Sequence, residues 1–214
     1  MLAGHDTTSN TLGFVIGALA SYPDVMAGIR AEHGKVVSKY GSLNSWEAVT
    51  ELEYTLAVVQ ETLRLNTVAF APLFRIADAD DTVPMADGTP LFVPKGTTVQ
   101  INFAAMHRNP KYWTEPESFI PDRFVQGTAA WKADLVLRGG KSHAFYYMPF
   151  SGGSKVCIGQ KFALAQVQTV VAILVSKYDF IPTSKMDMRQ AYGGITVAPV
   201  HAEMTVRRVV PPCA

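Results

Sequence analysis

The segment 150–159, FSGGSKVCIG, constrains the fold more than any other part of the sequence. Its adjacent glycines predict a turn, and the residues that follow, from 158 to 177, carry apolar side chains at helical spacing. The pattern therefore predicts a loop that brings Cys157 to the N-terminus of a long helix. Backbone N–H groups and the positive end of the helix dipole favour a thiolate at such a position, and Lys155 adds positive charge nearby.

Three interpretations of Cys157 compete: a buried core thiol, a reactive nucleophile and a metal ligand. A lone cysteine is most often a core thiol. A nucleophile needs a base, and no histidine has a spacing that ties it to Cys157 (His5, His33, His107, His143 and His201). Zinc needs three or four protein ligands, and the sequence has neither a C-x-x-C nor an H-E-x-x-H motif. The loop by itself therefore leaves the role of Cys157 open.

The composition indicates a folded globular protein that does not bind nucleic acid. The chain has 214 residues, 48% of them hydrophobic, and a formal net charge of +1. This apolar content argues against disorder, and the balanced charge gives no basic surface for nucleic acid. Two cysteines do not make a disulfide framework, which favours a reducing compartment. The sequence shows no signal peptide and no apolar run near the ~20 residues of a membrane-spanning helix.

Helical patterns dominate the first third of the chain. Helices are predicted over 2–20 and 23–41, where Pro23 suits a first turn and Gly41 suits a C-terminus. A short element is predicted to begin at Ser45, and apolar spacing predicts another helix over 51–65.

The sequence pattern changes several times after residue 70. Proline and glycine punctuate 71–100 and predict small strands and hairpins, with apolar pieces at 73–76, 91–93 and 97–101. We expect ordered coil over 108–124, an exposed insertion over 126–144, a long apolar helix over 158–177 and terminal strands over 178–208. The predicted fold class is mainly α with a minor, segregated β part, an α+β arrangement.

Three short motifs precede the cysteine segment: AGHDTT at 3–8, ETLR at 61–64 and PDRF at 121–124. Each has an ordinary explanation. Glu61 and Arg64 stand three residues apart, and such a pair is usually a solvated ion pair of little energetic weight. Asp6 and Thr7 could equally form a helix cap or a polar helix face.

In this order, however, the motifs resemble those of the cytochrome P450 monooxygenases, from residue 3 to the end of the terminal strands. The segment 150–159 is similar to the family's haem-binding signature, carried here by Phe150, Gly153, Lys155, Cys157 and Gly159. The family more often has arginine or histidine at the position of Lys155, so the charge is kept but the bidentate fork of arginine is lost. AGHDTT resembles the oxygen-activation segment of the long distal helix, ETLR the E-x-x-R motif, and PDRF the arginine motif that joins it.

The resemblance implies a haem-thiolate monooxygenase that inserts one atom of O2 into a small hydrophobic organic substrate. Haem b would take Cys157 as its axial ligand, shielded by Phe150, with Arg75 on a propionate. Asp6 would belong to a proton route, and Thr7 would face bound oxygen. Glu61, Arg64 and Arg123 would form a structural network that locks the coil before the cysteine loop. NADPH would supply electrons indirectly, through NADPH-cytochrome P450 reductase or an equivalent donor.

The same resemblance implies which residues face the substrate, how much of the fold is present and where full-length relatives are located. The positions expected to face substrate are His5, Ala69, Phe70, Leu73 and Ile195. Residues 1–214 are expected to form a partial domain, the C-terminal half of the P450 fold, with the N-terminal half absent. The style of the motifs suggests a eukaryotic or fungal microsomal member, as in fungal secondary or xenobiotic metabolism. Its full-length relatives are expected in the endoplasmic reticulum membrane, facing the cytosol.

Two alternatives remain open. The chain could be a truncated, non-catalytic remnant that binds haem weakly or not at all. It could also rearrange a peroxide or dehydrate an oxime without an external reductant, although the presence of Asp6 and Thr7 argues for oxygen activation.

Overall fold

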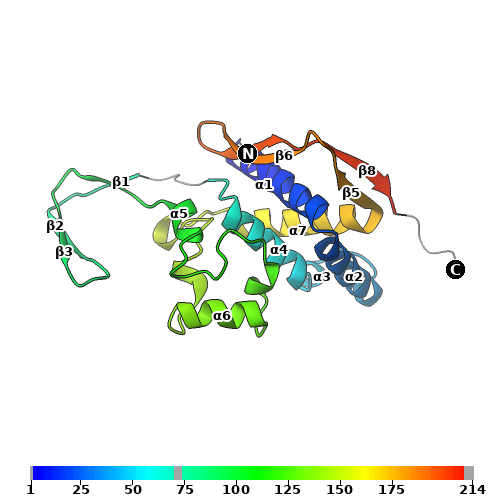
Figure 1. Cartoon of the computed structure of the whole chain (residues 1–214), viewed down its shortest axis with the longest axis horizontal. Coiled ribbons are helices and arrows are strands. Elements are labelled where there is room, and N and C mark those ends of the chain that lie inside the picture. Colours follow the sequence, from blue (N-terminus) through cyan, green and yellow to red (C-terminus); the bar gives the residue numbers. More distant parts are fainter. Residues whose placement is uncertain (1, 70–73, 210–214) are drawn as a thin grey trace.

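A computed structural model describes residues 2–69 and 74–209, except for the side chain of Leu2. Within the described residues, four long helices form the body of the molecule: α1 (Leu2–Ser21), α2 (Pro23–Tyr40), α4 (Glu53–Leu65) and α7 (Gln160–Lys177). Each of these helices packs against the other three, and Figure 1 shows them grouped beside the terminal strands. The predicted mainly α fold with minor, segregated strands is confirmed.

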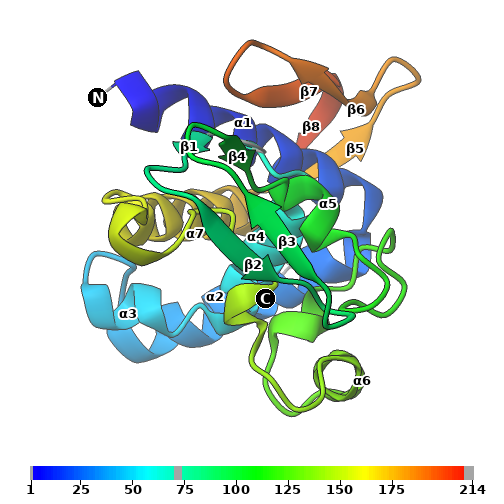
Figure 2. The ribbon, with the colours of Figure 1, turned by 90° about the vertical axis from the view of Figure 1, so that its left-hand side faces the viewer.

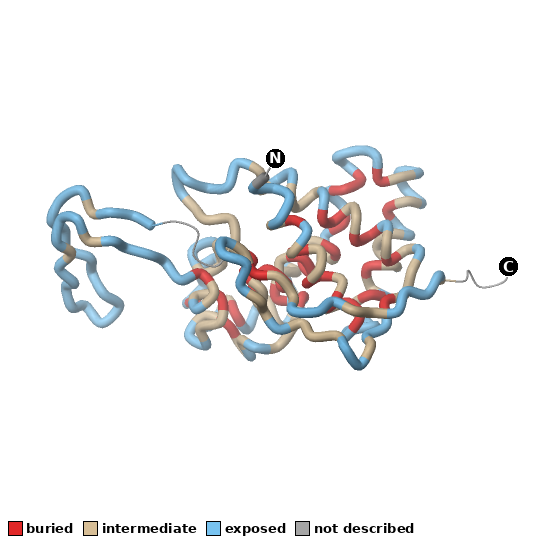
Figure 3. Tube along the Cα trace, turned by 90° about the horizontal axis from the view of Figure 1, so that it is seen from above, coloured by how far each residue is buried: buried red, intermediate tan, exposed pale blue. Residues whose placement is uncertain are grey.

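The hydrophobic core lies where these four helices meet. It includes Phe14, Val15 and Leu19 from α1, Ile29 from α2, Val58 and Val59 from α4, and Val167, Val171 and Val175 from α7. Figure 3 shows buried residues concentrated in this helical body. The apolar spacing of each helix in the sequence therefore corresponds to one face turned into a shared core.

The helix boundaries follow local chemistry. Pro23 occupies the first turn of α2, where its missing N–H costs nothing. Gly41 ends α2 with φ of 77°, and its N–H donates to the Val37 carbonyl at 2.8 Å. Ser45 caps α3 (Trp46–Thr50) by accepting from the backbone N–H of Ala48. These stops agree with the boundaries expected from the sequence.

Helix α4 begins with help from α2. Its N-cap residue, Leu52, makes no side-chain cap. Instead, the Glu32 carboxylate accepts from the backbone N–H of Tyr54 at 2.6 Å and from that of Thr55 at 2.8 Å. A negative group at a helix N-terminus satisfies free N–H groups and complements the helix dipole. A tertiary contact therefore sets the start of α4.

Two antiparallel strand pairs form the first β part. Strand β1 (Phe74–Ile76) pairs with β4 (Thr98–Gln100), and β2 (Asp81–Pro84) pairs with β3 (Pro90–Val93). Figures 1 and 3 both show this part projecting away from the helical body, with most of its residues exposed. The predicted pieces at 73–76, 91–93 and 97–101 overlap β1, β3 and β4, whereas β2 is too polar to stand out by composition.

The second β part covers α1. Strand β5 (Tyr178–Pro182) pairs with β8 (Met204–Arg208), and β6 (Asp187–Tyr192) pairs with β7 (Val197–His201). Strands β5 and β7 contact α1, and Figure 1 shows these strands along that helix. Phe180 and Val197 extend the helical core into these strands.

The coil between the two β parts is ordered around short elements: α5 (Phe103–His107), the 3-10 turns η1 (Pro121–Phe124), η2 (His143–Phe145) and η3 (Gly153–Lys155), and α6 (Ala129–Leu137). Figure 2 shows α6 at one end of this region. The expectation of an exposed insertion over 126–144 is wrong at two positions, because Asp134 and Arg138 are only 0% and 4% exposed. One face of α6 is turned inward, where its acid meets buried arginines.

Within the described residues, no single helix is both long and apolar enough to cross a membrane. One bent pair, Ala3–Ser21 with Pro23–Tyr40, meets that test on length and composition when its two helices are taken together, with a bend of 110°.

Candidate functional site

The cysteine loop, defined here as residues 148–159, is held by its own backbone. Ser151 N–H donates to the Met148 carbonyl at 3.1 Å, and Cys157 N–H donates to the Phe150 carbonyl at 2.9 Å. Gly153 has φ of 66°, which a residue without a side chain adopts freely. A Cβ at Gly152 would overlap the Cε of Met148. The two glycines therefore allow a compact turn that returns the chain to the start of α7.

Cys157 lies exposed at the end of this loop, directly before α7. Its neighbours include exposed apolar side chains: Ile158, which is fully exposed, Phe162, which is 75% exposed, and Val156. The interpretation of Cys157 as a buried core thiol is therefore wrong. Exposed apolar side chains so close in sequence to an exposed sulfur are consistent with a surface for an apolar ligand.

The surroundings of Cys157 are open, and few protein side chains lie near its sulfur. Among the described residues, no group of three or more His, Cys, Asp or Glu could hold a metal ion. A Cβ at Gly159 would have only the Cys157 Sγ near it, at 3.9 Å, and one at Gly153 would meet open space. A flat, apolar macrocycle that carries iron, such as haem, suits this single sulfur and its open surroundings.

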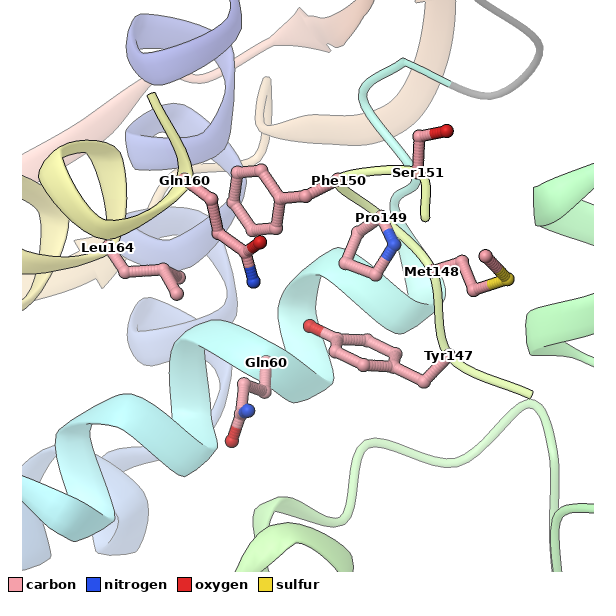
Figure 4. A pocket seen from close by; sticks show the side chains of 8 residues that line it. All are labelled: Gln60, Tyr147, Met148, Pro149, Phe150, Ser151, Gln160 and Leu164. Carbon is pink, nitrogen blue, oxygen red and sulfur yellow. The ribbon is translucent and has the colours of Figure 1, made fainter. Parts of the chain in front are cut away.

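Phe150 connects the loop to the core. Its ring is half-buried and packs against the main core cluster. A cavity of about 70 Å³ lies beside it, between α4, the loop and α7, and Figure 4 shows the lining side chains: Gln60, Tyr147, Met148, Pro149, Phe150, Ser151, Gln160 and Leu164. The Tyr147 hydroxyl is buried and has no hydrogen-bond partner among the described residues. Burial raises the pKa of Tyr147 well above its usual range.

Glu61 and Arg64 form a buried ion pair near the end of α4. The Glu61 carboxylate accepts from Arg64 Nε at 2.7 Å and from Arg64 Nη2 at 2.9 Å, and both side chains are 0% exposed. Arg123 joins them from η1, with its Nε 3.0 Å from Glu61 Oε1. This is not the solvated pair that the spacing of Glu61 and Arg64 would give by itself. A buried pair of this kind is costly to break, because one partner would remain as an uncompensated charge.

Arg64 also fastens the coil that follows α5. Its Nη1 donates to the carbonyls of His107 at 2.9 Å and Pro116 at 2.6 Å, and its Nη2 donates to that of Ser118 at 3.0 Å. The backbone N–H of Ile120 donates to Glu61 Oε1 at 2.8 Å. The E-x-x-R pair thus holds four points of a segment that has little regular structure of its own.

Asp134 is a member of this network that the sequence did not reveal. Its Oδ2 accepts from Arg123 Nη1 at 2.7 Å, and its Oδ1 accepts from the N–H and the hydroxyl of Thr114 at 2.7 and 2.6 Å. The Arg138 Nη1 lies 3.9 Å from Asp134 Oδ2. No motif marks Asp134, because its hydrogen-bond partners, Arg123 and Thr114, are 11 and 20 residues away.

The Trp113 ring lies among the arginines of this network. It is 1% exposed, and the guanidinium carbons of Arg64, Arg123 and Arg138 lie 5.4, 5.9 and 5.1 Å from its ring centroid. Cations over an indole face are attracted by its quadrupole, more strongly when water is excluded. The ring therefore helps to keep several arginines in one buried site.

His107 is a second residue that the motifs did not include. Its side chain is 0% exposed, and both ring nitrogens have partners. Burial, with Arg64 nearby, lowers the pKa of His107 to about 3. The imidazole is therefore neutral at physiological pH.

The AGHDTT residues lie in the first turns of α1. Asp6 Oδ1 is 2.9 Å from His5 Nδ1, and both side chains are largely exposed. The Thr7 hydroxyl donates to the Ala3 carbonyl at 2.8 Å. Thr7 is half-buried, whereas Asp6 before it is exposed.

The other predicted positions are spread over the surface. Arg75 is exposed on β1, where its Nη1 donates to the carbonyl of Phe74. Lys155 is exposed on the cysteine loop, and Ile195 is exposed between β6 and β7. Ala69 is half-buried, while the predictions for Phe70 and Leu73 lie outside the described residues.

Comparisons with known proteins place this geometry in a family. A family model described as cytochrome P450 matches residues 1–206. Cytochrome P450 3A7 from Homo sapiens is 33% identical over 197 residues, which cover 91% of this chain and 36% of the relative. Cytochrome P450 4Z1 from Homo sapiens is 34% identical over 183 residues, with 85% and 33% covered. Cytochrome P450 4A10 from Mus musculus is 31% identical over 183 residues, with 85% and 32% covered.

This chain spans about a third of the length of these curated relatives. The matched stretch includes the start of α1, the buried pair on α4, the arginine of η1 and the cysteine loop. The chain is therefore a member of the cytochrome P450 family.

Proposed function

We propose that this chain forms the cysteine-bearing part of a haem-thiolate monooxygenase. The observation that carries the proposal is the exposed Cys157 sulfur at the loop–helix junction, surrounded by exposed apolar side chains. Family membership supports haem as the group that would bind there. When bound, thiolate-ligated haem supplies the reductive activation of O2 and the transfer of one oxygen atom to an organic substrate.

The residues of the loop would hold and protect the axial bond. Cys157 would give the thiolate ligand, and Phe150, packed on the core, would keep water from the sulfur. Gly153 and Gly159 leave room for a flat group to approach. Lys155 and Arg75 are cations that could pair with the carboxylates of the macrocycle. The dielectric and hydrogen bonding around a metal ligand tune the metal.

Asp6 and Thr7 would hold and move protons for the reaction. Both lie at the edge of α1, where the Asp6 carboxylate is largely exposed and can exchange protons with water. The Thr7 hydroxyl, which donates to the Ala3 carbonyl in this structure, would be the second group on the proton route. The substrate would be small, organic and hydrophobic, with His5, Ala69 and Ile195 facing it.

Electrons would come from NADPH through a reductase, docking on the exposed side that carries Lys155 and Lys161. A complete protein of this kind would work at the cytosolic face of the endoplasmic reticulum. The alternative is a chain that binds haem weakly or not at all. A group bound only against the exposed Ile158 and Phe162 would keep much of its surface in water, whereas sites for apolar ligands normally bury most of the ligand surface.

One absorption measurement tests the proposal. The chain is expressed with a supply of haem, reduced and exposed to carbon monoxide. We expect the red-shifted Soret band of a thiolate-ligated carbonyl complex, and its loss in Cys157→Ser. The matched control is Cys213→Ser, which changes the other cysteine of the chain and should keep the band. Absence of haem uptake by the unchanged chain would favour the non-catalytic alternative.

A further inference from the structure

His107 joins two parts of the molecule through its ring. Its Nε2 lies 2.8 Å from the backbone nitrogen of Met148, the first residue of the cysteine loop. Its Nδ1 lies 2.9 Å from the hydroxyl oxygen of Thr67, just beyond α4. The rings of Phe103 and Tyr147 lie 6.4 and 5.3 Å away and pack around the imidazole.

The partners of His107 determine its tautomer. A backbone N–H can only donate, so Nε2 must accept from Met148 and cannot carry a proton. The proton of the neutral ring therefore sits on Nδ1 and is donated to Thr67. The Thr67 hydroxyl in turn donates to the carbonyl of Leu63, on α4, at 3.2 Å. In this series of hydrogen bonds, from the Met148 N–H to the Leu63 carbonyl, each donor meets an acceptor.

The same residue is tied to the ion-pair network through its backbone, since Arg64 Nη1 donates to the His107 carbonyl at 2.9 Å. On the other side, the Met148 carbonyl accepts from Ser151, within the turn that precedes Cys157. His107 therefore contacts the buried Glu61–Arg64 pair through its carbonyl and the cysteine loop through its ring. Removing the imidazole would leave the Met148 N–H without its acceptor at a half-buried position.

We propose that His107, as its Nδ1–H tautomer, is the positioning residue that transmits the geometry of α4 and its ion pair to the cysteine loop. The inference rests on the proposed function, in which Cys157 is the axial ligand. Outer residues that orient a metal ligand commonly affect metal affinity as much as ten- to a hundredfold. The lowered pKa of His107 is consistent with this role, because the acceptor at Nε2 stays available at physiological pH.

Two substitutions separate the two ring contacts. In His107→Gln, the side-chain oxygen can occupy the place of Nε2 and accept from Met148. In His107→Asn, the shorter side chain can reach Thr67 but not Met148. We expect amide hydrogen exchange across residues 148–157 to be about tenfold faster in His107→Asn, the equivalent of one hydrogen bond, and close to that of the unchanged protein in His107→Gln.

The haem-loaded protein gives a second readout. We expect His107→Asn, but not His107→Gln, to lose part of the thiolate-type Soret band of the reduced carbonyl complex. Equal exchange and equal spectra in the two variants would overturn the inference. If the unchanged protein shows no thiolate band, the proposed function fails, whereas the exchange comparison still tests the hydrogen bond to Met148.

A measurement on the unchanged protein does not depend on whether a variant folds. Nitrogen NMR of the His107 ring should show a protonated Nδ1 and an unprotonated Nε2. A ring protonated on Nε2 would overturn the inference, because that nitrogen could not accept from Met148.

Discussion

Replacing Asp134 by alanine tests the buried network at a position that no motif marks. The carboxylate is 0% exposed and accepts from Arg123 Nη1 and from the N–H and hydroxyl of Thr114. Without it, Arg123 keeps its contact with Glu61, but its Nη1 loses a charged partner at a site that excludes water. The two donors of Thr114 lose their acceptor as well.

The expected cost follows from these contacts. Removing one partner of a buried ion pair costs about 3–5 kcal/mol, and an unsatisfied buried donor costs about 1–3 kcal/mol. The two terms describe the same site and do not simply add. We therefore expect the free energy of unfolding to fall by about 3–5 kcal/mol in Asp134→Ala, and by less in Asp134→Asn, whose amide oxygen still accepts from Thr114.

Equilibrium unfolding in urea, followed by far-UV circular dichroism and by tryptophan fluorescence, measures this loss. The matched control is Glu51→Ala, which removes an exposed acid that is 2.6 Å from Lys39. Exposed pairs contribute about 0–1 kcal/mol, so the control should unfold at nearly the original midpoint. The reasoning is refuted if Asp134→Ala loses no more stability than Glu51→Ala.

Two further predictions concern protons. The pKa of His107 is lowered from 6.5 to about 3 in the folded protein, so the unfolded chain takes up a proton on this ring at a higher pH. The free energy of unfolding should therefore decrease by about 1.4 kcal/mol per pH unit as the pH falls from 6.5 towards 3. Urea midpoints at pH 7 and 5 should show this loss of stability in the unchanged protein, and an equal loss in His107→Gln would contradict the prediction. In the haem-loaded protein with a reductase, Thr7→Ala should raise the amount of peroxide formed per NADPH consumed. The control is Thr11→Ala, which removes another α1 hydroxyl that donates to a carbonyl one turn earlier and should leave the peroxide yield unchanged. An unchanged peroxide yield in Thr7→Ala would count against the proposed role of Thr7.

Much of the fold could be predicted, because its boundaries depend on nearby residues. Pro23 and Gly41 delimit α2 through backbone chemistry that needs no distant partner. The apolar spacing of α7 is visible in the sequence for the same reason. Strand β2 and helix α5 were harder to predict, because each is short and lacks a distinctive apolar pattern.

The residues of the candidate site and its network stand out in the sequence only where they belong to short motifs. Glu61, Arg64 and Cys157 belong to such motifs, whereas Asp134 and His107 act through partners far along the chain. A buried acid on an otherwise exposed helix has no periodic signal, so the segment that contains Asp134 looked like an insertion. The roles of Asp6, Thr7, Lys155 and Arg75 toward haem remain predictions.

The contact between Glu32 and the start of α4 has a consequence for the order of folding. Its partners, Tyr54 and Thr55, are 22 and 23 residues away, whereas Arg123 is 62 residues from Glu61. Closing a shorter loop costs less chain entropy, and an isolated helix as short as α4 is only marginally stable. Helix α2 can therefore nucleate α4 before the distant arginine arrives. Because the loop is tied to Arg64 of α4 through His107, we expect it to become ordered after α4.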